Sequence, residues 1–338
     1  MKENRVLTID NLTTTFESHK QKIQAVRGVS LHVDEGDILA IVGESGSGKS
    51  VTMKSVMGLL GENADVQADH LELLQKDLLS MSEKEKRKMR GKDMAMIFQD
   101  PMTALNPTMR IGRQISEVVS AHRNISKEEA EIEGKRMLEL VGIPAERYNE
   151  FPHQFSGGMK QRVVIAIALA CNPELLLADE PTTALDVTVQ AQVLELLKDL
   201  QKKLNTAILL ITHNLGVVWE MCDTVMVMYA GNTVEYADTK TLYKEPLHPY
   251  TWGLLDSMPK LSSSTKEDLK TIPGTPPDLR LTGHCCNFYN RCPYATEICK
   301  NQVPPLKEVA PGHFVACHRQ DGEHRLTRGE VNETCRKM

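Results

Sequence analysis

The residue types and spacing with the clearest chemistry lie near residue 45. The segment reads Gly43, Glu44, Ser45, Gly46, Ser47, Gly48, Lys49 and Ser50, and Val51 follows. The glycines leave room for backbone N–H groups to approach an anion, and a helix starting here adds the positive end of its dipole. We therefore predict a P-loop that holds nucleotide phosphates, with Lys49 on the terminal phosphates and the Ser50 hydroxyl on Mg²⁺.

The segments around this loop argue against the alternative, a chance match in a Gly- and Ser-rich turn. The apolar run 38–42 predicts a strand before the loop, and a helix is expected after it. Residues 5–40 alternate short apolar runs with turns, which predicts an antiparallel β layer beside the nucleotide. Phe16 in this layer could stack on the adenine, although a core position suits it about as well.

Polar side chains follow several other expected strands. Gln99 comes after the apolar run 94–98, and it could reach Mg²⁺ and the attacking water. Asp179 and Glu180 end the apolar run 175–178, so we expect Asp179 to hold Mg²⁺ and Glu180 to orient or deprotonate water. His213 follows the run 207–211 and could contact the γ-phosphate. The alternatives are solvated carboxylates and a core histidine.

A largely helical insert separates these two halves of the nucleotide core. It ends in Ser156, Gly157 and Gly158 before an apolar helix, which predicts a second anion site at a helix start. A second phosphate site makes sense if it closes over the nucleotide of another subunit; a simple Ser-capped helix is the alternative. Asp186, before the next helix, is a candidate for contacts across a dimer or for an N-cap. The charged run 80–92 predicts a solvated helix, with a basic docking patch as the alternative.

Composition limits the class of protein. The chain has 338 residues, 25% of them charged, and a formal charge of -5, which gives no general field for nucleic acid. It has neither the apolar stretch of a signal peptide nor a run of about 18 apolar residues. We therefore expect a cytoplasmic location and normal globular folding.

The motifs follow one another in the order GxxxxGKS, Gln, Ser-Gly-Gly, apolar-Asp-Glu, Leu-Asp and His. This order resembles that of the nucleotide-binding domain of ABC transporters, and the resemblance covers residues 5–260. Segments 98–107, 179–190 and 248–251 resemble the D-type ATPases of dipeptide and oligopeptide permeases. The resemblance implies an α/β P-loop NTPase of ABC type in residues 1–260, with an antiparallel β subdomain and a helical subdomain at about 100–165. Asn214 is a departure, because the family usually has Asp there.

The same resemblance implies an ATPase that powers peptide import from the cytoplasmic face of the inner membrane. Its partners would be two membrane-spanning permease subunits, a second and homologous ABC ATPase, and, through the complex, an extracytoplasmic peptide-binding protein. Each ATP would lie between the P-loop of one ATPase and the Ser156 segment of the other. The alternatives are a nickel importer ATPase and a soluble ABC ATPase acting on ribosomes or nucleic acid.

Residues 261–338 predict a loop-rich C-terminal region with clustered cysteines. Six of the eight cysteines follow residue 284, and in a cytosolic protein such clustering suggests metal ligation before disulfides. Cys286, Cys292, Cys299 and Cys317 lack a CxxC pair, so reduced structural thiols are the alternative. The resemblance implies that these four hold a [4Fe-4S] cluster, with Zn²⁺ as the alternative metal and Cys285 as a competing ligand.

Overall fold

The computed structural model describes residues 4–18, 21–183, 185–258, 271–280, 283–320 and 325–328. Its strands are β1 (Arg5–Ser18), β2 (Gln21–Asp34), β3 (Ile38–Val42), β4 (Ala64–Gln67), β5 (His70–Leu73), β6 (Lys76–Asp77), β7 (Met94–Ile97), β8 (Leu175–Asp179), β9 (Ala207–Ile211), β10 (Thr224–Tyr229), β11 (Asn232–Asp238), β12 (Lys307–Ala310) and β13 (His313–Val315). Its α-helices are α1 (Lys49–Met57), α2 (Glu83–Met89), α3 (Pro101–Ala104), α4 (Ile111–His122), α5 (Lys127–Leu140), α6 (Gly157–Leu169), α7 (Val187–Leu204), α8 (Leu215–Met221), α9 (Thr239–Lys244), α10 (Pro249–Asp256) and α11 (Glu297–Asn301). Short 3₁₀ segments are η1 (Ala145–Asn149), η2 (Pro152–Gln154), η3 (Tyr289–Arg291) and η4 (His318–Gln320).

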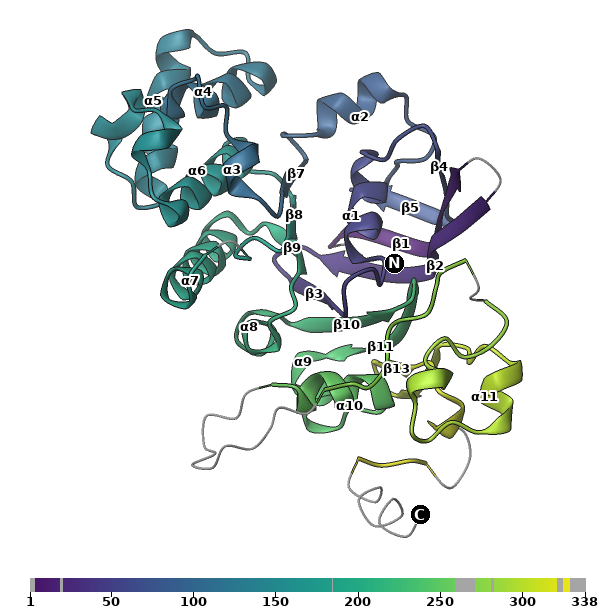
Figure 1. Ribbon diagram of the computed structural model, residues 1–338. Helices are drawn as coiled ribbons and strands as arrows, with labels where there is room; N and C mark the ends of the chain where they lie inside the picture. The colour runs from purple at the N-terminus through teal and green to yellow at the C-terminus, as the bar shows by residue number, and fades with distance from the viewer. Residues whose placement is uncertain are drawn as a thin grey trace, which may run out of the picture.

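A mixed sheet forms the centre of the molecule, with the strand order β12-β13-β11-β10-β3-β9-β8-β7 (Figure 1). The run from β10 to β7 is parallel, whereas β11 and β13 pair antiparallel at one side. Parallel strands bring their carboxyl ends to one edge, so the residues after β3, β7, β8 and β9 gather there.

The central strands are apolar throughout because both faces of the sheet are covered. Along β3, Leu39 and Ile41 belong to the core shared with the antiparallel sheet and α1. The alternate residues Ile38, Ala40 and Val42 belong to the core under the helices of the other face. The P-loop is therefore carried on a strand that is buried on both sides.

An antiparallel sheet lies beside the nucleotide loop, as predicted. The sequence suggested several short strands here, but the structure forms two strands of 14 residues, β1 and β2, which pair antiparallel. Register shifts, including one between Ile9 and Leu12, interrupt their pairing. These irregularities let long strands bend, which explains why the apolar pattern reads as shorter pieces.

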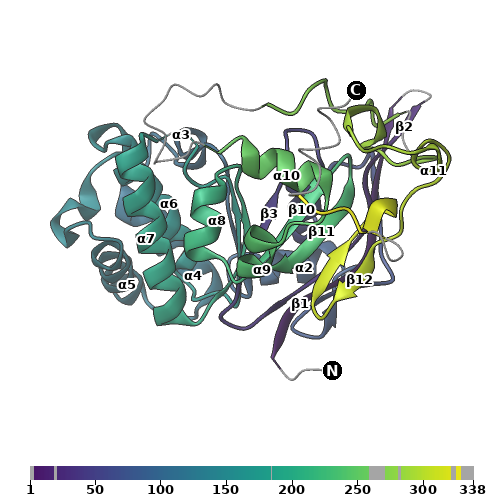
Figure 2. The same ribbon diagram turned by 90° about the horizontal axis from the view of Figure 1, so that it is seen from below.

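The predicted helical insert is present as α3, α4, α5 and α6, which form a lobe at one end of the molecule in two perpendicular views (Figures 1 and 2). The Ser126–Glu129 capping box starts α5. The sequence of helix α7 predicts an apolar stripe that runs from Val187 and Ala191 to Leu204. The start of this stripe is not buried, because Val187 is 82% exposed and Ala191 is also exposed. Val189 is partly buried against the core, and Val193, Leu194, Leu197 and Leu200 are buried.

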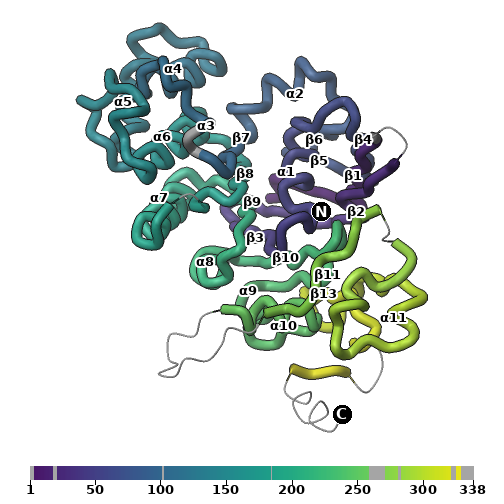
Figure 3. Tube along the Cα trace, viewed as in Figure 1, coloured from purple at the N-terminus to yellow at the C-terminus, as the bar shows by residue number. Residues whose placement is uncertain are grey.

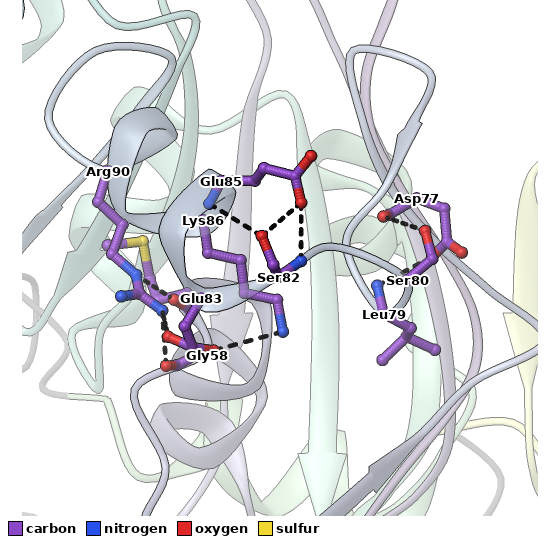
Figure 4. Close-up of polar contacts among 10 residues, drawn as sticks. Gly58, Asp77, Leu79, Ser80, Ser82, Glu83, Glu85, Lys86 and Arg90 are labelled. Atoms are coloured by element: carbon purple, nitrogen blue, oxygen red, sulfur yellow. Dashed lines mark hydrogen bonds and ion pairs between the residues drawn. The ribbon is translucent and has the colours of Figure 1, made fainter.

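The charged run 80–92 forms the predicted exposed helix, α2 (Figure 4). Ser82 and Glu85 form a capping box at its start. Arg90 donates to the carbonyls of Met57 and Gly58, and this ties α2 to the end of α1.

The C-terminal region joins the central sheet through β13, which pairs with β11 (Figure 3). Segment 271–280 also reaches the antiparallel sheet, where Arg27 Nη2 donates to the Leu279 carbonyl at 2.7 Å. The C-terminal region thus packs on the side of the molecule away from the helical lobe.

Candidate active site

The P-loop wraps around the Lys49 ammonium. Its Nζ donates to the carbonyls of Gly43 and Glu44, each at 2.8 Å, and approaches Ser47 Oγ at 3.4 Å. Burial lowers the pKa of Lys49, while the carboxylates of the site oppose that shift. The cation is therefore fixed at the start of α1, where phosphates are expected.

Two loop glycines are required by the backbone. Gly43 has φ 149°, and a Cβ there would lie 2.2 Å from the Met228 carbonyl oxygen. Gly48 has φ 101°, and its Cβ would lie 2.6 Å from the Ala25 carbonyl oxygen. Any side chain at either position would push the loop away from β10 or β2.

The other predicted loop residues differ in exposure. Ser45 and Gly46 face solvent, where a ligand could reach their N–H groups. Ser47 is buried, and its carbonyl accepts from Gly231 N at 3.0 Å. Val51 packs against the core and so supports the first turn of α1.

Ser50 and Asp179 meet where Mg²⁺ was expected. Ser50 Oγ donates to Asp179 Oδ1 at 2.9 Å. Burial raises the pKa of Asp179, and the Ser50 hydrogen bond opposes the shift. A buried carboxylate beside a hydroxyl provides hard oxygen donors, so these residues fit Mg²⁺.

Glu180 is the centre of the predicted catalytic group. Its Oε2 accepts from Gln99 Nε2 at 3.0 Å and from Thr183 Oγ1 at 2.8 Å, and His213 Nδ1 lies 3.6 Å from the same atom. The structure therefore brings together side chains from the ends of β7, β8 and β9. Glu180 also has φ 48°, a left-handed conformation that is uncommon outside glycine and found at functional sites.

The residue after His213 was the departure from the family pattern. The Asn214 side chain accepts from Gly216 N and Val217 N, at 3.0 and 3.3 Å, and caps α8. Asn and Asp cap helices about equally well, so the substitution keeps the local structure.

Ser156, Gly157 and Gly158 open α6 in the helical lobe, separate from α1 in Figure 1. Ser156 Oγ accepts from Met159 N at 3.4 Å, so its capping role is confirmed. A Cβ on Gly158 would lie 2.3 Å from Val189 Cγ1 of α7. Asp186 caps α7 by accepting from Val189 N at 3.0 Å.

Phe16 lies on β1 and pairs with Ile23 on one side and Ala64 on the other. It is half-buried, and its stacking on adenine stays a prediction.

Sequence reasoning gave no site role to three residues that contact the site. Thr183 binds Glu180, Tyr250 OH accepts from Glu44 N at 2.8 Å, and Arg291 binds the Glu44 carboxylate. Thr183 lies next to the Asp-Glu motif and could have been suspected. No local signal joins positions 250 and 291 to residue 44.

The prediction of a [4Fe-4S] or zinc site is wrong. Among the described residues, no group of three or more His, Cys, Asp and Glu side chains could hold a metal ion. Burial raises the pKa of Cys286 and Cys317 to about 12 and that of Cys292 to about 11, so as free thiols they are protonated at neutral pH. Cys299 is also buried, and all four cysteines are free thiols that form no disulfide. The alternative of reduced structural thiols therefore fits all four.

Comparisons with known proteins agree with this geometry. The ABC transporter family matches residues 26–183, and the oligopeptide/dipeptide transporter C-terminal region matches residues 234–299. The oligopeptide transport ATP-binding protein OppD of Bacillus subtilis is 54% identical, covering 92% of this chain and 88% of its own. The dipeptide transport ATP-binding protein DppD of the same organism is 48% identical, covering 97% and 99%.

Solved structures show the same fold. A dimeric ATP-binding cassette, solved in a post-hydrolysis state with ADP and Pi, has a TM-score of 0.60 and 27% identity, covering 69% of this chain and 98% of that one. The similarity to the curated relatives extends through the C-terminal region as well. The chain therefore belongs to the oligopeptide and dipeptide transport ATP-binding subunits of the ABC transporter family.

Proposed function

We propose that this chain is the ATP-hydrolysing subunit of an importer that takes up dipeptides or oligopeptides across the cytoplasmic membrane. The observation that carries the proposal is the convergence of Gln99, Thr183 and His213 on the Glu180 carboxylate, beside the Lys49 loop. The curated relatives are named for peptides, which favours peptides over nickel or ribosomes as the associated substrate.

Hydrolysis uses positioning and charge. Lys49 and the loop N–H groups bind the phosphates, and Ser50 and Asp179 would hold Mg²⁺, which neutralises phosphate charge. Glu180 orients the attacking water and accepts its proton, and hydrogen bonds from Gln99 and Thr183 keep the Glu180 carboxylate in place. The His213 imidazole, 65% exposed, is free to contact the γ-phosphate.

A complete site needs a second ATPase subunit. Ser156 to Gly158 present a helix start in the lobe apart from α1, and a structural relative with the same fold is a dimer. We infer that this segment closes on the nucleotide bound by the partner, which is a homologue of this chain or a second copy.

The remaining partners follow from the importer role. Within the described residues, no helix is long and apolar enough to cross a bilayer. Two permease subunits would supply the membrane pathway, and they would hold this chain at the cytoplasmic face of the membrane. Phe98, 44% exposed beside Gln99, is a candidate contact for them. An extracytoplasmic binding protein would deliver the peptide.

The test is purification of the complex from membranes, followed by identification of its subunits by mass and reconstitution in proteoliposomes. We expect permease subunits to copurify and peptide-loaded binding protein to stimulate both ATP hydrolysis and uptake of labelled peptide. Uptake of nickel without peptide uptake would contradict the cargo, and ATP hydrolysis with no membrane partner would contradict the importer role.

A further inference from the structure

Arg291 links the C-terminal region to the nucleotide loop. Its side chain is 4% exposed, and it lies 247 positions from Glu44 along the chain. Arg291 Nη1 donates to Glu44 Oε2 at 2.6 Å, and Nη2 donates to Glu44 Oε1 at 2.9 Å. This two-point contact between a guanidinium and a carboxylate is the strong and directional form of an ion pair.

The rest of the guanidinium is held by its own region and by β10. Arg291 Nε donates to the Pro273 carbonyl at 2.9 Å, Nη2 to the Ile272 carbonyl at 3.3 Å, and Nη1 to Tyr229 OH at 3.3 Å. Phe288, at the start of the same short segment, packs its ring against Tyr229. The position of the cation is thus set by the C-terminal fold.

Glu44 occupies a sensitive place in the loop. Its carbonyl accepts from Lys49 Nζ at 2.8 Å, and its N–H donates to Tyr250 OH. Its carboxylate is also one of the negative charges that act on Lys49. An unpaired carboxylate here would compete with nucleotide phosphates for the Lys49 charge and repel the triphosphate.

We propose that Arg291 is a positioning residue for ATP binding, because it neutralises the Glu44 carboxylate and fixes its direction beside the Lys49 loop. The C-terminal region therefore takes part in the nucleotide site. ATP binding at the P-loop then depends on the folding of that region, because the region positions Arg291 for its ion pair with Glu44. If Arg291 had a purely structural role, loss of Arg291 would weaken nucleotide binding whether or not Glu44 kept its charge.

The test measures the Kd of the full-length subunit for Mg-AMP-PNP, a non-hydrolysable analogue, by calorimetry. Arg291→Met should raise this Kd about tenfold, the scale of a lost charged hydrogen bond, and should raise the Kd for Mg-ADP less because ADP carries less charge. Adding Glu44→Gln to Arg291→Met removes the Glu44 carboxylate that the first change leaves without Arg291. The double variant should therefore return the Kd for Mg-AMP-PNP to within about threefold of the wild-type value.

Arg280→Met is the matched control, since Arg280 lies in the same region and, among the described residues, its side chain binds Asp278 and Gln21 and not the nucleotide loop. It should leave the Kd unchanged. An unchanged Kd in Arg291→Met, or a double variant that binds no better than Arg291→Met, overturns the proposal.

If Arg291→Met does not fold, Arg291→Lys replaces it. The lysine keeps the positive charge but loses the two-point contact of the guanidinium with the carboxylate, so the Kd should rise about threefold. A wild-type Kd in that variant also overturns the proposal.

Discussion

Ser50 Oγ donates a hydrogen bond of 2.9 Å to Asp179 Oδ1, which joins the first turn of α1 to the carboxyl end of β8. A hydroxyl and a buried carboxylate are held together although they are 129 positions apart in the sequence. We expect this contact to have opposite consequences for catalysis and for stability, because a carboxylate proposed to hold Mg²⁺ must be charged in a place that disfavours charge.

Asp179→Asn should abolish Mg²⁺-dependent ATP hydrolysis, with a loss of at least about 100-fold, and yet raise the melting temperature at neutral pH. Burial raises the pKa of Asp179, so the folded state binds its proton more tightly than the unfolded state does. The ionised carboxylate therefore costs stability above its folded pKa, and this cost disappears as the pH falls below its unfolded value of about 3.9. Calorimetric scans should show the gain of the variant shrinking toward acid pH, and a lower melting temperature at pH 7 would contradict it.

Glu180→Gln should bind ATP and accumulate a nucleotide-bound dimer while hydrolysis falls by about 100-fold or more. The amide keeps the size of the side chain but loses the base for the attacking water. Phosphate release and ATP-dependent elution on size exclusion would measure the two effects. Thr183→Ala, which removes only one donor to Glu180, is the matched control and should reduce hydrolysis by about tenfold or less. Undiminished turnover in Glu180→Gln would remove Glu180 from its role.

Gly158→Ala should impair ATP-dependent dimerisation without changing the ATP affinity of the isolated subunit. The added Cβ would meet Val189 Cγ1 at 2.3 Å, so α6 and α7 must move apart at the start of α6. Val189→Ala in the same chain removes the obstructing methyl groups and should restore most of the dimer, as followed by light scattering. Gly157→Ala is the control for the clash, because the nearest atom to its Cβ is Leu185 Cδ2 at 3.5 Å, an ordinary contact.

The sequence was sufficient to predict that the candidate catalytic residues lie together, because parallel strands fix where their ends go. Gln99, Glu180 and His213 each follow an apolar run, and adjacent strands β7, β8 and β9 place them at one edge. The pattern was insufficient wherever a long-range contact decides the outcome. The bond between Arg291 and Glu44 depends on how the C-terminal region packs.

The cysteine prediction was wrong for a related reason. Spacing along the chain shows that Cys286 and Cys292 are close in sequence, but it does not show whether their side chains meet other ligands in a geometry that can hold a metal. Among the described residues, no such group of side chains is present. Similarly, the apolar periodicity of α7 did not show that Val187 is exposed. Periodicity shows which residues share one face of a helix, but it does not show how much of that face is covered by neighbouring elements.

The C-terminal region should also depend on Glu235, which is fully buried on β11. Its Oε1 accepts from Leu247 N at 2.7 Å and lies 2.9 Å from His313 Nε2 of β13, while Oε2 accepts from His248 N at 3.0 Å. This carboxylate thus fastens β13 and the segment before α10 to one strand.

Glu235→Gln keeps the shape of the side chain but turns one acceptor into an NH₂ donor that faces donors already in place. We expect a loss of about 1–3 kcal/mol in the free energy of unfolding, because a buried polar group is left unsatisfied. The loss should be insensitive to salt, since the group is shielded from solvent. Glu245→Gln, on an exposed side chain paired with Lys244, is the control and should change stability by less than about 0.5 kcal/mol. Urea unfolding of both variants gives the measurement, and equal midpoints would show that the C-terminal region is held by its apolar contacts and not by this carboxylate.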